Sequence, residues 1–155
     1  SNLKNFYPIK LKNNKIFKFF IYFISDLYVG TLNGPFHLSQ FLNKKSLCID
    51  VIDFNCSVIF KKIKIVPKKL FNQKTKKVLS YREVYDKNLE NNYNDTEIKK
   101  TKIKVFFASP KQIIDAYQDL TLSSKFNHKK FKYQKESILN YVSNKFYNDN
   151  KNLFM

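Results

Sequence analysis

The sequence predicts an α/β fold: a Rossmann-like open parallel sheet with helices on both faces. Strand-like and helix-like apolar patterns alternate along the chain, and Gly and Pro mark a strand-to-helix turn. The 155 residues, 43% of them hydrophobic, suffice for one domain with a real core. We therefore expect residues 1–155 to form a single domain, with ligands at the carboxyl ends of its strands.

The first half of the chain predicts a parallel βαβ unit preceded by a helix. Apolar residues at three- and four-residue steps predict a helix over Leu11–Ile24 with one broad buried face. Leu27–Thr31 is a short buried strand, and Pro35 begins a helix that ends near Asn43. Ser46–Ile52, rich in apolar and β-branched residues, is the next strand. The expected buried face of the first helix is made by Leu11, Ile16, Phe19, Phe20, Phe23 and Ile24.

The middle of the chain is less regular. Asp53–Lys69 is interpreted as a long connection over the strand ends, although Ile63, Ile65 and Pro67 alternate within it. Ser80 and Glu83 have the spacing of a capping box, which predicts a short helix.

A further strand and helix are expected after a polar loop at Glu90–Thr96. Ile103–Phe107 is the strand, and Ser109 caps the helix that follows, with Ile113, Ala116, Tyr117 and Leu120 on its apolar face. A last helix is predicted over Phe131–Tyr147, and the tail beyond it is expected to fray. Its stripe consists of Ile138, Leu139, Val142 and Phe146.

The formal charge of +17 suggests an anionic partner. However, only Arg82 among the 29 basic residues is arginine, a profile typical of an AT-rich genome. A nucleic-acid reader would use arginine for bidentate and stacking contacts that lysine cannot make. The composition therefore argues against nucleic acid, while attraction to polyanionic ligands or to an acidic inner membrane face remains expected.

Nothing in the sequence predicts a metal site or a membrane span. Cys48 and Cys56 form no CxxC pair and are expected to be buried thiols, and the two histidines are isolated in sequence. The longest apolar stretch, Phe19–Ile24, is far shorter than the roughly 20 residues that cross a bilayer. No signal peptide is evident, so we expect a cytoplasmic protein, and we expect the 155 residues to be a fragment of a longer chain.

One local motif has a phosphate-binding mechanism, the turn from Gly30 to Leu38. Gly34 would let a ligand approach the backbone, Pro35 starts the helix, and free first-turn amides at the positive end of the helix dipole would face a diphosphate. The alternative is a plain connector, because strand-to-helix turns commonly contain Asn, Gly and Pro.

Four segments in order resemble a family of surface-carbohydrate glycosyltransferases of the GT-B type, over about Ile16–Leu122. They are Val29-Gly30-Thr31-Leu32-Asn33-Gly34-Pro35, Val66-Pro67-Lys68-Lys69-Leu70, Val78-Leu79-Ser80-Tyr81-Arg82-Glu83 and Ser109-Pro110-Lys111-Gln112-Ile113-Ile114-Asp115-Ala116. The resemblance implies the carboxy-terminal, donor-binding half of a two-domain enzyme. Its partners would be a nucleotide-activated sugar as substrate, a saccharide or lipid-linked acceptor, and an amino-terminal domain absent from this sequence.

The resemblance also indicates site residues. Asn33 stands where relatives more often have Ser or Asp before the Gly. No cofactor or metal is required, and the catalytic base would belong to the other half. The expected diphosphate contacts are Thr31, Asn33, Gly34, Pro35, Phe36 and His37, mainly through amides after Pro35.

Three further side chains have two interpretations each. Glu83 could bind a donor ribose, although its place in the capping box explains it without a ligand. Arg82 could contact a phosphate bidentately, or it could be an exposed residue at a helix start. His37 could donate to an oxyanion or serve as a neutral packing residue.

The leading hypothesis is donor binding for sugar transfer in surface polysaccharide or lipopolysaccharide synthesis. The alternative is a basic module that binds nucleic acid or an anionic surface and has no enzymatic activity. A third possibility is a ligand-free domain kept for protein interaction.

Overall fold

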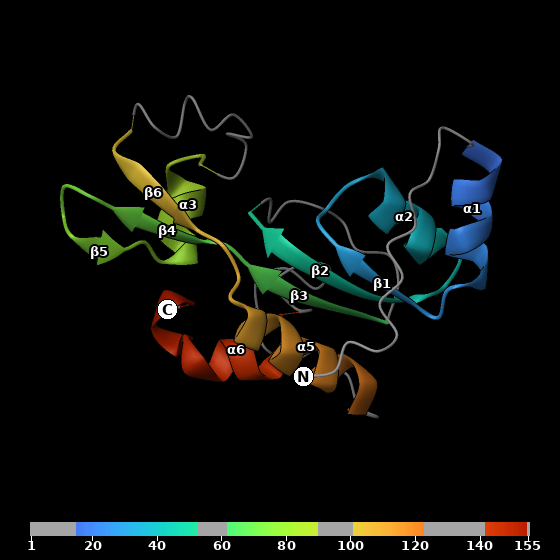
Figure 1. Ribbon diagram of the computed structural model, residues 1–155. Helices are drawn as coiled ribbons and strands as arrows, with labels where there is room; N and C mark the ends of the chain where they lie inside the picture. Colours follow the sequence, from blue (N-terminus) through green and yellow to red (C-terminus); the bar gives the residue numbers. More distant parts are fainter. Residues whose placement is uncertain (1–14, 53–61, 90–100, 123–141, 155) are drawn as a thin grey trace.

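The computed structural model describes residues 15–52, 62–89, 101–122 and 142–154, and these form a mixed α/β fold (Figure 1). One sheet is parallel, in the order β1 (Leu27–Gly30), β2 (Lys45–Val51) and β3 (Ile63–Pro67). A second, antiparallel sheet has the order β5 (Lys77–Val78), β4 (Lys69–Asn72) and β6 (Ile103–Phe106). The predicted α/β class and parallel sheet are confirmed, whereas the antiparallel sheet was not predicted.

The first βαβ unit is confirmed to within about two residues at each boundary. β1 pairs with β2 in parallel, with Leu27 opposite Lys45 and Gly30 opposite Cys48. α2 (Gly34–Phe41) connects the two strands. α2 is held to β2 by the buried Ser39 and Ser46 hydroxyls, 2.8 Å apart.

Helices cover both faces of the parallel sheet, as predicted. α2 lies on one face, and α5 (Pro110–Leu122) packs against β2 and β3 on the other (Figure 1). Ser109 caps α5 as expected, accepting the Gln112 amide at 3.3 Å. The expected apolar face of α5 is confirmed for Ala116 and Leu120, which are buried, whereas Tyr117 is 44% exposed.

The interpretation of Asp53–Lys69 as a connection was wrong, because residues 63–67 form β3. All five of its residues are buried, and β3 runs parallel to β2. Strands buried on both faces normally show a continuous apolar run, but Lys64 interrupts this one although it is only 3% exposed. The strand was not predicted because this buried lysine interrupts its apolar pattern.

The second predicted parallel step was also wrong. Residues 103–106 form β6, but β6 pairs with β4 in antiparallel fashion, with Lys69 opposite Phe106 and Asn72 opposite Ile103. β4 and β5 were not predicted. The short helix was predicted correctly: α3 (Tyr81–Asp86) follows β5, and Ser80 is its N-cap.

The first helix was expected to bury its apolar face, and this was wrong. α1 (Lys15–Ile24) contacts the rest of the protein through Tyr22, whose ring centroid lies 6.4 Å from that of Tyr28, and through Phe23, whose ring centroid lies 5.9 Å from the Lys44 ammonium. The predicted buried face is instead exposed, by 51–81% over Ile16, Phe19, Phe20, Phe23 and Ile24. Leu11 lies outside the described residues. In the described part of the chain, no helix combines the length and apolar character needed to cross a membrane.

The last predicted helix is only partly correct. Ile138 and Leu139 lie outside the described residues, and Val142 forms a parallel bridge with Ile65 rather than a helical turn. Ser143 then precedes the short helix α6 (Asn144–Asp149), which contains the buried Phe146. The tail does not fray, because a 3-10 turn (Lys151–Leu153) follows and buries Leu153.

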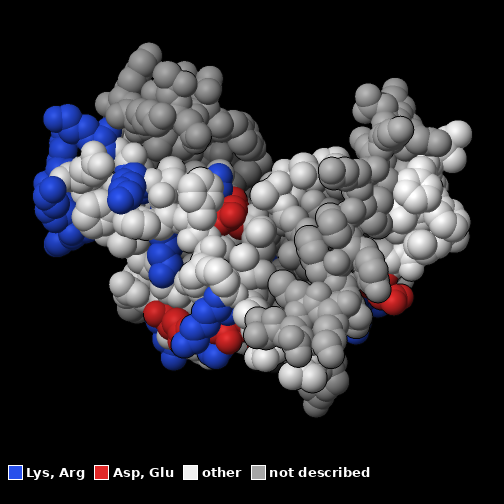
Figure 2. All heavy atoms as spheres, viewed as in Figure 1, with Lys and Arg blue, Asp and Glu red and all other residues white. Residues whose placement is uncertain are grey.

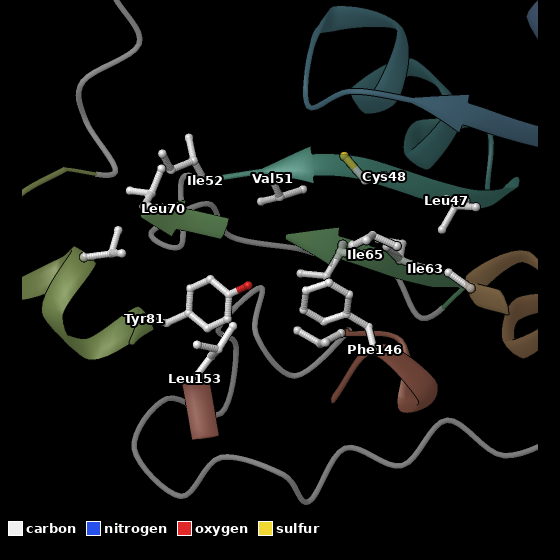
Figure 3. Packing of buried hydrophobic residues seen from close by; sticks show 14 of the residues in the cluster. Leu47, Cys48, Val51, Ile52, Ile63, Ile65, Leu70, Tyr81, Phe146 and Leu153 are labelled. Atoms are coloured by element: carbon white, nitrogen blue, oxygen red, sulfur yellow. The ribbon is translucent and has the colours of Figure 1, made fainter. Parts of the chain in front are cut away.

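A single hydrophobic core joins the two sheets (Figure 3). Leu70 and Tyr81 of the antiparallel part belong to the same buried cluster as Ile65 of β3 and Phe146 and Leu153 of the carboxyl-terminal segment. This is possible because only Lys68 separates β3 from β4, and Tyr81 donates its hydroxyl to the Lys68 carbonyl at 3.2 Å. The antiparallel sheet therefore extends the carboxyl ends of the parallel strands (Figure 1).

Candidate functional site

The turn between β1 and α2 is the strongest candidate site, and its centre is Asn33. Asn33 has an extended backbone (φ −155°, ψ −177°) and caps α2 by accepting the Phe36 amide on its side-chain oxygen at 3.2 Å. The same oxygen accepts the Tyr28 hydroxyl at 3.0 Å, and the Asn33 amide nitrogen donates to the Thr31 hydroxyl at 3.2 Å. Thr31, Asn33 and Gly34 are exposed, so the side chains and the first helical residue are accessible to a ligand.

The expectation of free first-turn amides needs correction. Pro35 has no amide hydrogen. The Phe36 amide is bonded to the Asn33 side chain, and the His37 amide is bonded to the Asn33 carbonyl at 3.2 Å. Within the described residues, Gly34 is the first-turn amide without an acceptor. The turn thus presents one open amide, one capped amide and two polar side chains.

Tyr28 fixes this turn, a role that was not predicted from the sequence. Its hydroxyl donates to the Thr31 carbonyl at 3.1 Å as well as to Asn33, and its ring lies over Gly30. A Cβ atom added to Gly30 would overlap the phenol and lie 2.7 Å from its Cζ atom. Burial, together with the nearby Cys48 and Tyr22, raises the pKa of Tyr28. The sequence signal for this contact is a Tyr two residues before a Gly at the end of a strand.

The two glycines of the motif therefore have different roles. Gly30 is required by the packing of Tyr28, whereas a Cβ atom at Gly34 would meet no atom within 4 Å. Neither glycine has a positive φ. Neither packing nor backbone conformation in the described residues therefore demands glycine at position 34.

Of the remaining predicted contacts, Phe36 is a core residue. It is 2% exposed and packs its ring 6.1 Å from that of Tyr28, so it can offer a ligand only its backbone. His37 is exposed and its ring meets the Phe36 ring edge-on at 5.5 Å. Its side chain therefore both packs and faces solvent.

The structure does not bring Arg82 and Glu83 to this turn. Both are on α3, which lies beside the antiparallel sheet, away from α2 (Figure 1). Glu83 forms the predicted capping box: its carboxylate accepts the Ser80 amide at 2.7 Å, which is the main reason why its pKa is lowered. The Arg82 side chain is 82% exposed and lies 3.8 Å from the Asp86 carboxylate. The capping and surface interpretations explain both residues.

Asp50 is a second residue whose role was not predicted from the sequence. It interrupts the register of β2 and β3 and has a left-handed backbone, with φ of 57°. Its carboxylate accepts the Ala108 amide at 2.7 Å, immediately before Ser109 and α5. Gly30, the last residue of β1, lies opposite Cys48 of β2. Asp50 is only two residues further along β2, so it lies close to the start of the β1–α2 turn. Asp50 thus ties the start of α5 to the same edge of the sheet.

The described residues include no group of three or more His, Cys, Asp or Glu side chains placed to hold a metal ion. Cys48 is buried, as expected. Cys56 and His128 lie outside the described residues.

Comparison with known proteins gives no relative from which a function could be transferred. No protein-family model matches the chain, and neither a curated protein nor a solved structure matches it.

Proposed function

We propose that this chain is the donor-binding half of a GT-B-type glycosyltransferase, with a Rossmann-like fold that binds a nucleotide-activated sugar. The observation that carries the proposal is the exposed Asn33 cap of α2, which follows a parallel strand at its carboxyl end. Ligands of open α/β sheets bind at this edge, and the positive end of a helix dipole favours a diphosphate. The order of the four glycosyltransferase-like segments, the first of which contains this turn, also supports the proposal.

In this proposal the diphosphate binds to the turn in two stages. It first contacts the open Gly34 amide and the Thr31 hydroxyl. A phosphate oxygen then replaces the Asn33 oxygen as acceptor of the Phe36 amide, which is possible because the cap is an exposed side chain rather than backbone. The released Asn33 amide group can donate to the same phosphate.

The chemistry follows from charge. Transfer of the sugar leaves a nucleoside diphosphate, and donors preorganised at the leaving oxygen stabilise the negative charge that develops in the transition state. Backbone amides supply such donors in this turn, and the positive end of the α2 dipole adds a favourable field. The acceptor and the catalytic base belong, in this proposal, to a second domain facing the turn.

Calorimetric titration of uridine- and guanosine-diphosphate sugars tests the proposal. We expect saturable binding that Asn33→Leu and Thr31→Val each weaken, because each removes polar atoms at the diphosphate. Thr75→Val, at an exposed turn of the antiparallel sheet, is the matched control and should bind as the wild type does. If the longest natural chain containing this sequence shows no saturable binding to any sugar nucleotide, the proposal is wrong.

A further inference from the structure

One end of the antiparallel sheet carries a cluster of lysines, which we call the basic sheet end. Its members are all exposed, and the Gln73 amide donates to the Lys102 carbonyl at 3.0 Å, which ties the β4–β5 turn to the start of β6. Figure 2 shows basic side chains gathered over this end of the molecule. The basic sheet end consists of Lys74, Lys76, Lys77, Lys102 and Lys104.

Nearby acidic groups do not neutralise this charge. Glu83 is close enough to Lys77 for the lysine to contribute to its lowered pKa, and it adds one negative charge. Five lysines less this one negative charge leave +4 (5 − 1).

Apolar side chains accompany Lys104 on one face of the sheet, whereas the register places Lys77, opposite Asn72, on the other face. The pairing register places Val78, Phe71 and Lys104 side by side across the three strands. Val78 is 38% exposed and Phe106 is 42% exposed. Phe106 meets Phe71 edge-on at 6.0 Å, and the Lys104 ammonium lies 5.2 Å from the centre of the Phe106 ring. The face is therefore basic with a small exposed apolar component.

We propose that the basic sheet end binds the anionic headgroups of a lipid bilayer. Clustered lysines on a projecting surface are attracted to an anionic bilayer without a fixed contact geometry, and neighbouring apolar side chains can enter the interface. Single-stranded nucleic acid would instead require open aromatic faces for stacking. In this sheet a lysine lies over the more exposed ring, and the described part of the sheet contains no arginine.

This surface is separate from the β1–α2 turn, so its test does not depend on donor binding. The 155-residue chain is sedimented with vesicles of phosphatidylcholine alone and with vesicles that also contain phosphatidylglycerol, in the absence of any sugar nucleotide. We expect binding only to the anionic vesicles, with an affinity that decreases as salt increases.

A pair of charge-matched variants locates the binding surface. The first replaces Lys74, Lys76, Lys77 and Lys102 by Gln, and the second replaces the exposed Lys45, Lys62, Lys111 and Lys151 by Gln. Each lowers the formal charge from +17 to +13 (17 − 4). We expect the first variant to lose about 100-fold or more in vesicle affinity, and the control to lose less than about tenfold.

Several outcomes would overturn the inference. If the wild-type chain bound neutral and anionic vesicles equally, the inference would be wrong. This result needs no variant, so it holds even if the first variant fails to fold. Equal losses in two folded variants, checked by circular dichroism, would show that net charge rather than this surface determines binding. Tight binding of single-stranded RNA through the same lysines, without vesicle binding, would assign the surface to nucleic acid.

Discussion

Replacing Gly34 by Val separates a ligand requirement from a fold requirement at the β1–α2 turn. Gly34 is the first residue of α2, its φ is not positive, and an added Cβ atom meets nothing within 4 Å. Val has a slightly higher helix propensity than Gly and restricts the unfolded chain. We therefore expect the free energy of unfolding to change by less than about 0.5 kcal/mol.

Gly30→Val is the matched comparison, four residues earlier. Its Cβ atom overlaps the Tyr28 phenol, so the ring must move and lose its hydrogen bonds to Thr31 and Asn33. Each such bond contributes a net 0.5–1.5 kcal/mol, roughly, and the preference of Val for strands offsets part of the loss. We expect a destabilisation of about 1–2 kcal/mol.

Urea unfolding measures both stabilities, and calorimetry with a uridine-diphosphate sugar measures donor binding. Gly34→Val should be as stable as the wild type but should not bind, because its side chain occupies the space next to the open amide. Two results would refute this reasoning: a Gly34 variant less stable than the Gly30 variant, or a Gly34 variant that binds the donor with wild-type affinity.

Three further predictions concern stability. Ser80→Ala removes the cap of α3 and should lower the free energy of unfolding by about 1 kcal/mol in urea titrations; an unchanged midpoint would contradict the importance of the capping box. Gln40 is 4% exposed, and within the described residues neither of its side-chain polar atoms has a hydrogen-bond partner. Gln40→Met should therefore raise the free energy of unfolding by about 1–3 kcal/mol, and a lower melting temperature would count against the reasoning. Burial lowers the pKa of Lys64, opposed by Asp119, so the unfolded state binds more protons between that lowered pKa and 10.5. Wild-type stability relative to Lys64→Met should therefore increase as the pH rises through this window, and a constant difference in urea titrations would contradict the shift.

The elements that the sequence predicted correctly have local causes. α2 begins where Asn33 caps it, and α3 begins where Ser80 and Glu83 satisfy each other's backbone amides. Such interactions involve residues three positions apart, so they can be recognised in a linear pattern. The candidate turn was predicted for the same reason, but its residues were only partly understood. The role of Gly30 was not predicted, because the position of the Tyr28 ring against it is not evident from the sequence.

The sequence by itself determined the α/β class, the first βαβ unit and the helix caps, since periodicity and capping act over a few residues. Only the tertiary structure decided which strands pair. β6 has the composition of a parallel strand but pairs antiparallel with β4, and β3 is a buried strand although it contains Lys64. The tertiary structure also decided that the apolar face of α1 is exposed rather than buried. Strand partners and burial depend on contacts between residues far apart in the chain, and no local pattern specifies those contacts.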